Sequence, residues 1–137
     1  MTKLIIGLVL LALTMALAER PSWYPENAAE LEVKCMKEHA VSPETVANMR
    51  AFNLDEAPAI VAVLFCSGKA KKIYTPELGF VPERFAYAMK TNVKMDCNVD
   101  YIRNCAEQHK DVQPVDTMYF KVVKCVFDNR EGHCTKV

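Results

Sequence analysis

The sequence lacks any strong imbalance of charge: 17 lysine and arginine residues stand against 17 aspartate and glutamate residues, a formal net charge of zero. It also lacks a stripe of basic residues and an acidic tail. Nucleic acids and other polyanions are therefore not expected partners, because proteins that bind them gather lysine and arginine on one face. The near-neutral charge also argues against a structural or antimicrobial disulfide protein, which would usually be cationic.

Catalytic and metal-binding motifs are missing as well. There is no G-x-S-x-G or H-E-x-x-H, and His39, His109 and His133 belong to no recognisable motif. A secreted phospholipase would need adjacent cysteines next to a His-Asp pair, which is absent. Zinc sites usually use closely spaced cysteine pairs such as C-x₂-C, and this chain has none. We expect no enzyme activity, no metal and no cofactor.

The first feature that the chain does contain is a predicted signal peptide over residues 1–18. A basic Lys3 precedes an apolar run from Leu4 to Leu17, and small residues at Ala16 and Ala18 predict cleavage before Glu19. The run is shorter than the roughly 20 residues of a transmembrane helix, so we expect no membrane insertion. The mature chain, residues 19–137, is long enough for one domain and should be secreted and extracellular.

Cysteine is the most informative residue type in the mature chain. An even number of cysteines in a short exported protein predicts a framework of disulfides, here three. Six cysteines permit fifteen pairings, and composition does not choose among them. The cysteines are Cys35, Cys66, Cys97, Cys105, Cys125 and Cys134.

Hydrophobic periodicity predicts helices throughout and no convincing strand. Ser42 before Pro43 is a strong helix-start signal, because serine caps free amides and proline lacks one. The stretch 60–66 is apolar all round and indicates a helix buried on every side, with a buried strand as the alternative. The predicted helices cover about 26–40, 42–53 and 55–71, then begin at Pro82, at Asp96 and at Pro114 or Asp116, with a loop over 74–80 and a short polar tail over 128–137.

The predicted fold is all-α: a single compact bundle of about six short helices around an apolar cavity, held by three disulfides. Methionine is abundant, and its flexible, polarizable side chain suits a wall that adapts to varied ligands. Ordinary packing in the helical core is the alternative role for each candidate, so the prediction concerns the group. The candidate ligand-binding residues are Met49, Phe52, Leu64, Phe65, Phe85, Met89, Val99, Met118, Tyr119 and Val122.

Tyrosines supply candidate polar contacts for a ligand. Tyr74, Tyr87, Tyr101 and Tyr119 could each orient a ligand hydroxyl or carbonyl, and the alternative for most of them is an exposed phenol. Each tyrosine side chain combines an apolar ring with a single polar hydroxyl. They therefore extend the predicted ligand site without replacing its apolar wall.

The cysteine spacing and the segment 66–85 resemble the insect odorant-binding family, specifically its minus-C branch, over about residues 31–129. In that segment a helix, a short glycine-containing loop and a second helix follow one another as in the family. Two standard cysteines are replaced together: Ala62 lies four positions before Cys66, and Asp116 lies nine before Cys125. The positions that match the family's first, third, fourth and sixth cysteines are Cys35, Cys66, Cys105 and Cys125.

This resemblance implies disulfides Cys35–Cys66 and Cys105–Cys125. Cys97 and Cys134 have no counterpart in the standard pattern, and we expect them to pair with each other. Asp116, in place of a buried cysteine, has two interpretations: a polar group at the pocket edge, or the favoured one, a cap whose carboxylate accepts amides of Met118 or Tyr119.

The resemblance also implies a function: a secreted carrier of small hydrophobic ligands such as odorants, pheromones or fatty-acid-like molecules. The expected partners are the ligand and, as a further candidate, a membrane receptor. The alternative is a secreted interaction or effector protein on the same scaffold, in saliva or reproductive fluid, that binds a host mediator or a protein partner. The ligand, the tissue and the oligomeric state are not indicated.

Overall fold

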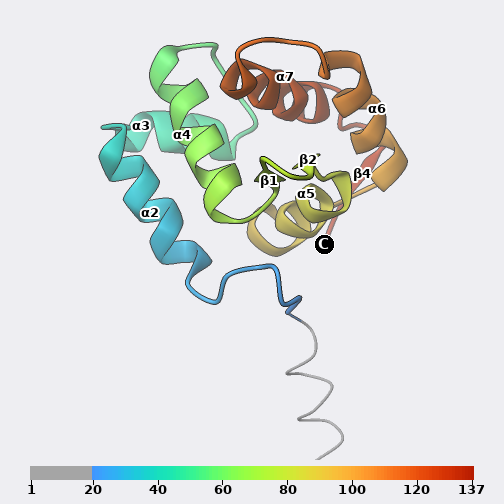
Figure 1. The fold of residues 1–137 in the computed structure, drawn as a ribbon, viewed down its shortest axis with the longest axis horizontal. Helices are drawn as coiled ribbons and strands as arrows, with labels where there is room; N and C mark the ends of the chain where they lie inside the picture. Colours follow the sequence, from blue (N-terminus) through green and yellow to red (C-terminus); the bar gives the residue numbers. More distant parts are fainter. Residues whose placement is uncertain (1–19) are drawn as a thin grey trace, which may run out of the picture.

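The computed structural model describes residues 20–137, and the predicted signal peptide lies outside the described residues. The chain from 20 onward forms six α-helices, a π-helical turn and two pairs of short strands, which confirms the all-α prediction (Figure 1). In the view of Figure 1, α2 and α3 lie on one side of the molecule and α6 on the other. The helices are α2 Ala28–Glu38, α3 Pro43–Arg50, α4 Pro58–Ala70, α5 Pro82–Ala88, α6 Val99–His109 and α7 Val115–Asp128, and the π turn η1 spans Met89–Val93.

The start of α3 is the one that the sequence locates best. Ser42 is its N-cap, and the Ser42 Oγ accepts a hydrogen bond from the backbone amide of Thr45 at 3.1 Å. Pro43 occupies the first helical position, where a missing N–H costs no hydrogen bond. A hydroxyl acceptor and a preset φ therefore act together at this helix start.

Two predicted caps are wrong. Asp55 does not cap α4, which begins three positions later at Pro58 after an extended segment. Asp96 does not cap α6, because it belongs to a short strand; Asn98 caps α6 instead, and its Oδ1 accepts the Tyr101 amide at 3.1 Å. Asp and Asn are both good caps, so the residue type alone did not fix the position.

The apolar stretch in α4 is a helix buried on every side. No residue from 60 to 68 is exposed. Helix α4 packs against α2 on one side and α7 on another. A helix enclosed in this way needs no polar face, which explains the unbroken apolar run.

The prediction of no strand is wrong in two places. Strand β1 (Tyr74–Thr75) pairs with β2 (Gly79–Phe80) inside the predicted loop, and β3 (Met95–Cys97) pairs with β4 (Cys134–Lys136). Strands of two or three residues are too short to show an alternating pattern. The β3–β4 pairing also joins segments far apart in the sequence, so no local signal announces it.

Three disulfides join elements in pairs. Cys35–Cys66 links α2 to α4, Cys105–Cys125 links α6 to α7, and Cys97–Cys134 links β3 to β4. The first two are the pairs that the family resemblance implies, and the third is the expected remaining pair. No disulfide joins α4 to α7 among the described residues, so that contact depends on packing.

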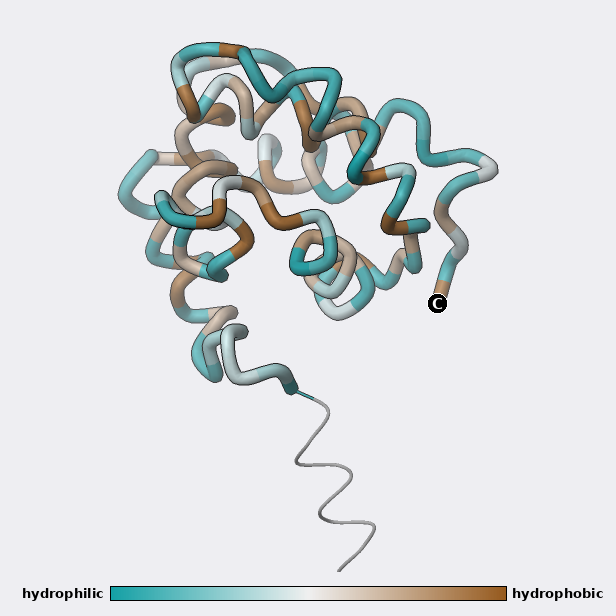
Figure 2. The backbone as a smooth tube through the Cα atoms, turned by 45° about the vertical axis from the view of Figure 1, so that its right-hand side comes forward, coloured by the Kyte–Doolittle hydropathy of each residue, from teal (hydrophilic) through white to brown (hydrophobic). Residues whose placement is uncertain are grey.

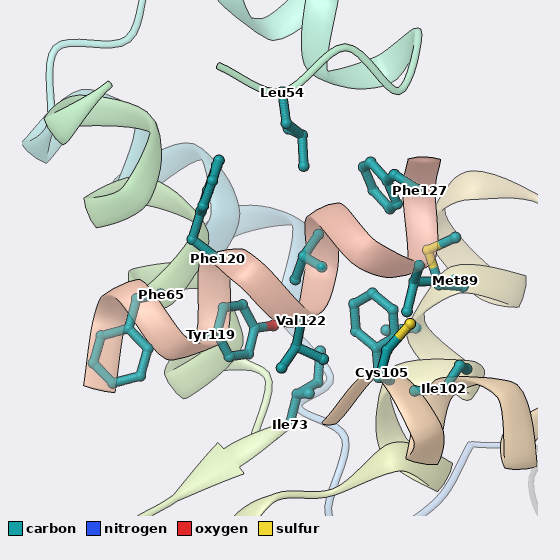
Figure 3. Packing of buried hydrophobic residues seen from close by; sticks show 14 of the residues in the cluster. Leu54, Phe65, Ile73, Met89, Ile102, Cys105, Tyr119, Phe120, Val122 and Phe127 are labelled. Atoms are coloured by element: carbon teal, nitrogen blue, oxygen red, sulfur yellow. The ribbon is translucent and has the colours of Figure 1, made fainter. Parts of the chain in front are cut away.

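The core is built around α7. Phe120, Val122 and Val126 of this helix are almost completely buried, and α7 packs against both α4 and α6. Figure 3 shows part of this cluster, with side chains of several helices around α7. Figure 2 shows hydrophobic and hydrophilic positions interspersed along much of the chain, the pattern expected of helices that pack one apolar stripe against a core.

Candidate ligand-binding site

A partly enclosed cavity of about 550 Å³ lies among α2, α3, α4, α5 with η1, and α7. Each helix contributes side chains spaced three or four positions apart, the spacing of one helical face. The wall is therefore a set of stripes from separate helices. The lining residues are Glu32 and Met36; Val46, Met49 and Arg50; Leu64, Ser67 and Lys71; Ile73; Phe85, Ala88, Met89, Asn92 and Val93; and Tyr119, Val123 and Phe127.

Five of the predicted ligand contacts line this cavity: Met49, Leu64, Phe85, Met89 and Tyr119. They come from four different helical stripes, so the structure brings together side chains that the sequence scatters over seventy positions. Phe85, Met89 and Tyr119 are buried, and Met49 and Leu64 are partly buried. The other five predicted contacts lie elsewhere.

Val122 and Met118 are on α7 but not on its cavity stripe. That stripe is Tyr119, Val123 and Phe127, and the neighbouring positions one residue earlier face the core or a second hollow. Val122 is fully buried in the core, and Met118 lines a smaller groove together with Phe80. A shift of one residue turns a helical side chain by about 100° around the axis, which separates the two roles.

Phe52, Phe65 and Val99 do not line the cavity, and the two phenylalanines pack against other aromatic rings. The Phe52 ring lies 5.0 Å from the Phe127 ring, with Arg130 over its face. The Phe65 ring lies 5.2 Å from Tyr74 and 5.8 Å from Tyr119, behind the lining layer. Val99 opens α6, and α6 contributes no lining residue.

Among the four candidate tyrosines only Tyr119 lines the cavity. Tyr87 lies in an aromatic cluster with Trp23 and Tyr24, and the Tyr101 hydroxyl donates to the backbone carbonyl of Val126 at 2.8 Å. Tyr74 forms part of β1. These contacts are structural, since each ties one segment of the chain to another.

Tyr119 is a buried polar residue of the cavity wall. Tyr119 is 3% exposed, and its hydroxyl makes no hydrogen bond with the residues that the structure describes. Burial raises the pKa of Tyr119, so the phenol stays protonated at neutral pH. Within residues 20–137 no fully enclosed side-chain nitrogen or oxygen lacks a partner, so this oxygen is not fully enclosed, although the end of the ring lies against Gly68 of α4. It can donate one hydrogen bond to a ligand.

One region of the wall is polar. Lys71, at the end of α4, forms an ion pair with Glu32 of α2 at 3.1 Å between Nζ and Oε1. The Lys71 side chain is 7% exposed, whereas that of Glu32 is 40% exposed. Asn92 of η1 also lines the cavity, and its Nδ2 donates to the Tyr24 hydroxyl at 3.1 Å. Burial raises the pKa of Tyr24, and the nearby negative charge of Glu32 adds to this effect.

Sequence reasoning missed the charged wall residues. A helix C-terminus favours cations, which explains Lys69 and Lys72 at the end of α4 but not the buried Lys71. A signal was present: Leu64 and Lys71 lie seven positions apart, so they share one face of α4, and so do Glu32 and Met36 on α2.

Asp116 fits neither of its two interpretations. Its Oδ1 accepts the backbone amide of Thr117 at 2.7 Å, not those of Met118 or Tyr119, and Pro114 stands at the N-cap of α7. It does not line the cavity. The helix begins one residue before Asp116, so the carboxylate lies too far into the first turn to act as the predicted cap.

A group of potential metal ligands lies outside the cavity. Glu38, His39 and Cys66 place one ligand atom each within 4.8 Å of one another. The Cys66 sulfur is bonded to Cys35, so it is no thiolate, and two protein ligands remain where zinc sites use three or four.

None of the helices in residues 20–137 is long and apolar enough to span a bilayer.

A family model described as the PBP/GOBP family matches residues 21–129. Every lining residue of the cavity falls inside that range. No curated protein and no solved structure matches the chain significantly.

Proposed function

Because this chain belongs to the PBP/GOBP family, a family of small-ligand carriers rather than enzymes, we propose that it is a secreted carrier of small hydrophobic molecules held in the cavity. Odorants, pheromones and fatty-acid-like molecules are the ligand classes in view. The observation that carries the proposal is a cavity of about 550 Å³ with lining side chains from five helical segments. Ligand pockets typically measure about 300–1,000 Å³ and are mostly apolar with a few polar groups.

The composition of the wall supports a carrier with broad tolerance. Three methionines, Met36, Met49 and Met89, line the cavity. Unbranched methionine side chains change rotamer at low cost, so one wall can fit ligands of different outline. The Tyr119 hydroxyl adds one fixed hydrogen-bonding point.

Secretion and the minus-C assignment belong to the same proposal. Three disulfides suit an oxidising, extracellular environment, as does the predicted signal peptide over 1–18. Ala62 and Asp116 stand at the positions of the missing cysteine pair, which supports a place in the minus-C branch with Cys97–Cys134 as an additional pair.

The test is displacement of an uncharged apolar fluorophore, N-phenylnaphthylamine, from the oxidised mature protein by long-chain alcohols, esters, acids and aromatics. We expect micromolar displacement by some of them and loss of binding after the disulfides are reduced. A correctly folded protein that binds neither the fluorophore nor any ligand would overturn the carrier function and favour the interaction or effector alternative.

A pair of tryptophan variants locates the binding. Met49→Trp should fill part of the cavity from α3 and weaken ligand binding several-fold. Leu78→Trp is the matched control, because Leu78 is 62% exposed and does not line the cavity. Equal binding by both variants and the unmodified protein would place the ligand elsewhere.

A further inference from the structure

We propose that the cavity selects ligands with a carboxylate head group, which binds Lys71, while the apolar tail of the ligand lies against the methionine and phenylalanine side chains. The inference rests on the proposed carrier function and names the ligand chemistry of the same site. The charges on the cavity wall and their burial determine this preference.

Lys71 is the one buried charged residue among residues 20–137. A buried ammonium loses its water, and its three N–H groups each need an acceptor. The described residues supply a single acceptor, Oε1 of Glu32 at 3.1 Å. Lys71 lines the cavity, so the open donor positions are available to a ligand oxygen there.

The charge balance of the wall favours an anion. The charged lining residues are Lys71, Arg50 and Glu32, two cations and one carboxylate. Arg50 has no ion pair within the described part of the chain. Arg50 is exposed, so water screens its excess positive charge, whereas Lys71 is buried in a lower dielectric, which strengthens its attraction for a carboxylate.

A cationic ligand is the competing possibility, with Glu32 as its partner. Lys71 already holds Glu32, so a ligand amine near this carboxylate would also lie near the Lys71 ammonium. Like charges at close range oppose binding. The Glu32 side chain is partly exposed to solvent, and the solvent further weakens its electrostatic attraction for an amine. The wall therefore discriminates against amines.

The order of residues along α4 matches an amphipathic acid. Lys71, Ser67 and Leu64 all line the cavity and follow one another along one face of the helix. Each helical turn rises about 5.4 Å, so the wall changes from charged to apolar within two turns. A carboxylate at Lys71 would direct its alkyl chain toward Leu64.

The experiment compares four ligands with the same alkyl chain: dodecanoic acid, methyl dodecanoate, dodecanol and dodecylamine. Each displaces N-phenylnaphthylamine from the oxidised mature protein at neutral pH, below the critical micelle concentration of the ligand. We expect the acid to bind at least about tenfold more tightly than its methyl ester, which corresponds to about 1.4 kcal/mol. The amine should bind most weakly.

Variants assign the preference to Lys71. Lys71→Met keeps an unbranched side chain, one heavy atom shorter and uncharged, and should abolish the preference for the acid while the ester binds as before. Lys72→Met is the matched control, because Lys72 is exposed, outside the lining, and carries the same charge. Glu32→Gln should strengthen acid binding, since it frees Lys71 and removes a negative charge from the wall.

The outcomes separate this inference from the carrier function. Equal affinity for acid and ester in the unmodified protein, or an acid preference that survives Lys71→Met, would overturn the inference while binding itself stands. An unchanged acid affinity in Glu32→Gln would also contradict it. Absence of all binding would count against the carrier function instead.

Discussion

At the scale of single residues, Gly68 of α4 lets the Tyr119 ring of α7 lie directly against α4. A Cβ atom at this position would lie 2.7 Å from Cε2 of Tyr119 and closer still to the end of the same ring. The ring of Tyr119 is also held against Phe65 and Phe80, so it has little room to move. Gly68 thus lets the aromatic wall of the cavity rest directly on α4, where no disulfide joins the two helices.

We predict that Gly68→Ala lowers the free energy of unfolding by about 1–3 kcal/mol, the usual cost of overpacking a core, although alanine is the better helix former. Chemical denaturation checks this value. A Tyr119→Leu background provides the control, since it removes the outer half of the ring and should make Gly68→Ala nearly neutral or stabilising. An equal cost in both backgrounds would mean that Tyr119 is not the obstacle.

The residue scale also shows how far the sequence could identify the site. The apolar character of the wall and five of its lining residues could be predicted, because helical periodicity marks which residues share a face. It could not choose between adjacent faces of α7, both of which are apolar: Val122 faces the core and Val123 the cavity. It missed Lys71, since a buried charge depends on a partner in another helix, Glu32 of α2.

At the scale of elements, the C-terminal tail, residues 128–137, is held to the rest of the fold but lies away from the cavity. The β3–β4 ladder and the Cys97–Cys134 disulfide fix it, and the His133 ring stacks on Tyr101 at 4.1 Å between ring centroids. The Val137 amide donates to the Lys94 carbonyl at 2.9 Å. No residue after Phe127 lines the cavity. The tail should therefore contribute to stability and not to binding.

We predict that Cys97→Ala with Cys134→Ala lowers the free energy of unfolding by up to about 4 kcal/mol, the chain-entropy value for such a loop. The affinity for the fluorophore should remain unchanged in the folded protein. Denaturation and fluorescence titration measure the two quantities. Removal of the pair Cys35–Cys66 is the comparison, because it joins two helices that line the cavity and should reduce affinity as well. Weaker binding after loss of the tail disulfide alone would contradict the separation.

Element boundaries show a second limit of the sequence. The start of α3 was predictable because Ser42 and Pro43 together make an unambiguous signal. The starts of α4 and α6 were not, since Asp55 and Asp96 are equally good caps that the chain does not use. The β3–β4 ladder is set by pairing between distant segments, and its formation follows from the fold and not from local propensity.

At the scale of the whole molecule, one wall of the cavity is much less embedded than the others. Helix α3 has no buried residue, makes few contacts with other elements and is held by no disulfide. It nevertheless supplies Val46, Met49 and Arg50 to the cavity. Its C-terminal side is anchored where Phe52, at a φ of 66°, packs on Phe127. Ligands should therefore exchange by outward movement of α3 about this anchor.

Hydrogen exchange on the free and ligand-bound protein tests this expectation. Local opening has a low free energy where few apolar contacts hold an element, so the amides of α3 should exchange faster than those of α4 and α7. Ligand binding should slow exchange most strongly in α3, because the ligand adds the apolar contacts that this helix lacks. Phe52→Ala should raise exchange in α3 without affecting α6, which lies outside the cavity. If ligand protection appeared in residues 129–137 instead, or if α3 were as protected as α7 in the free protein, the exchange route would run through another part of the fold.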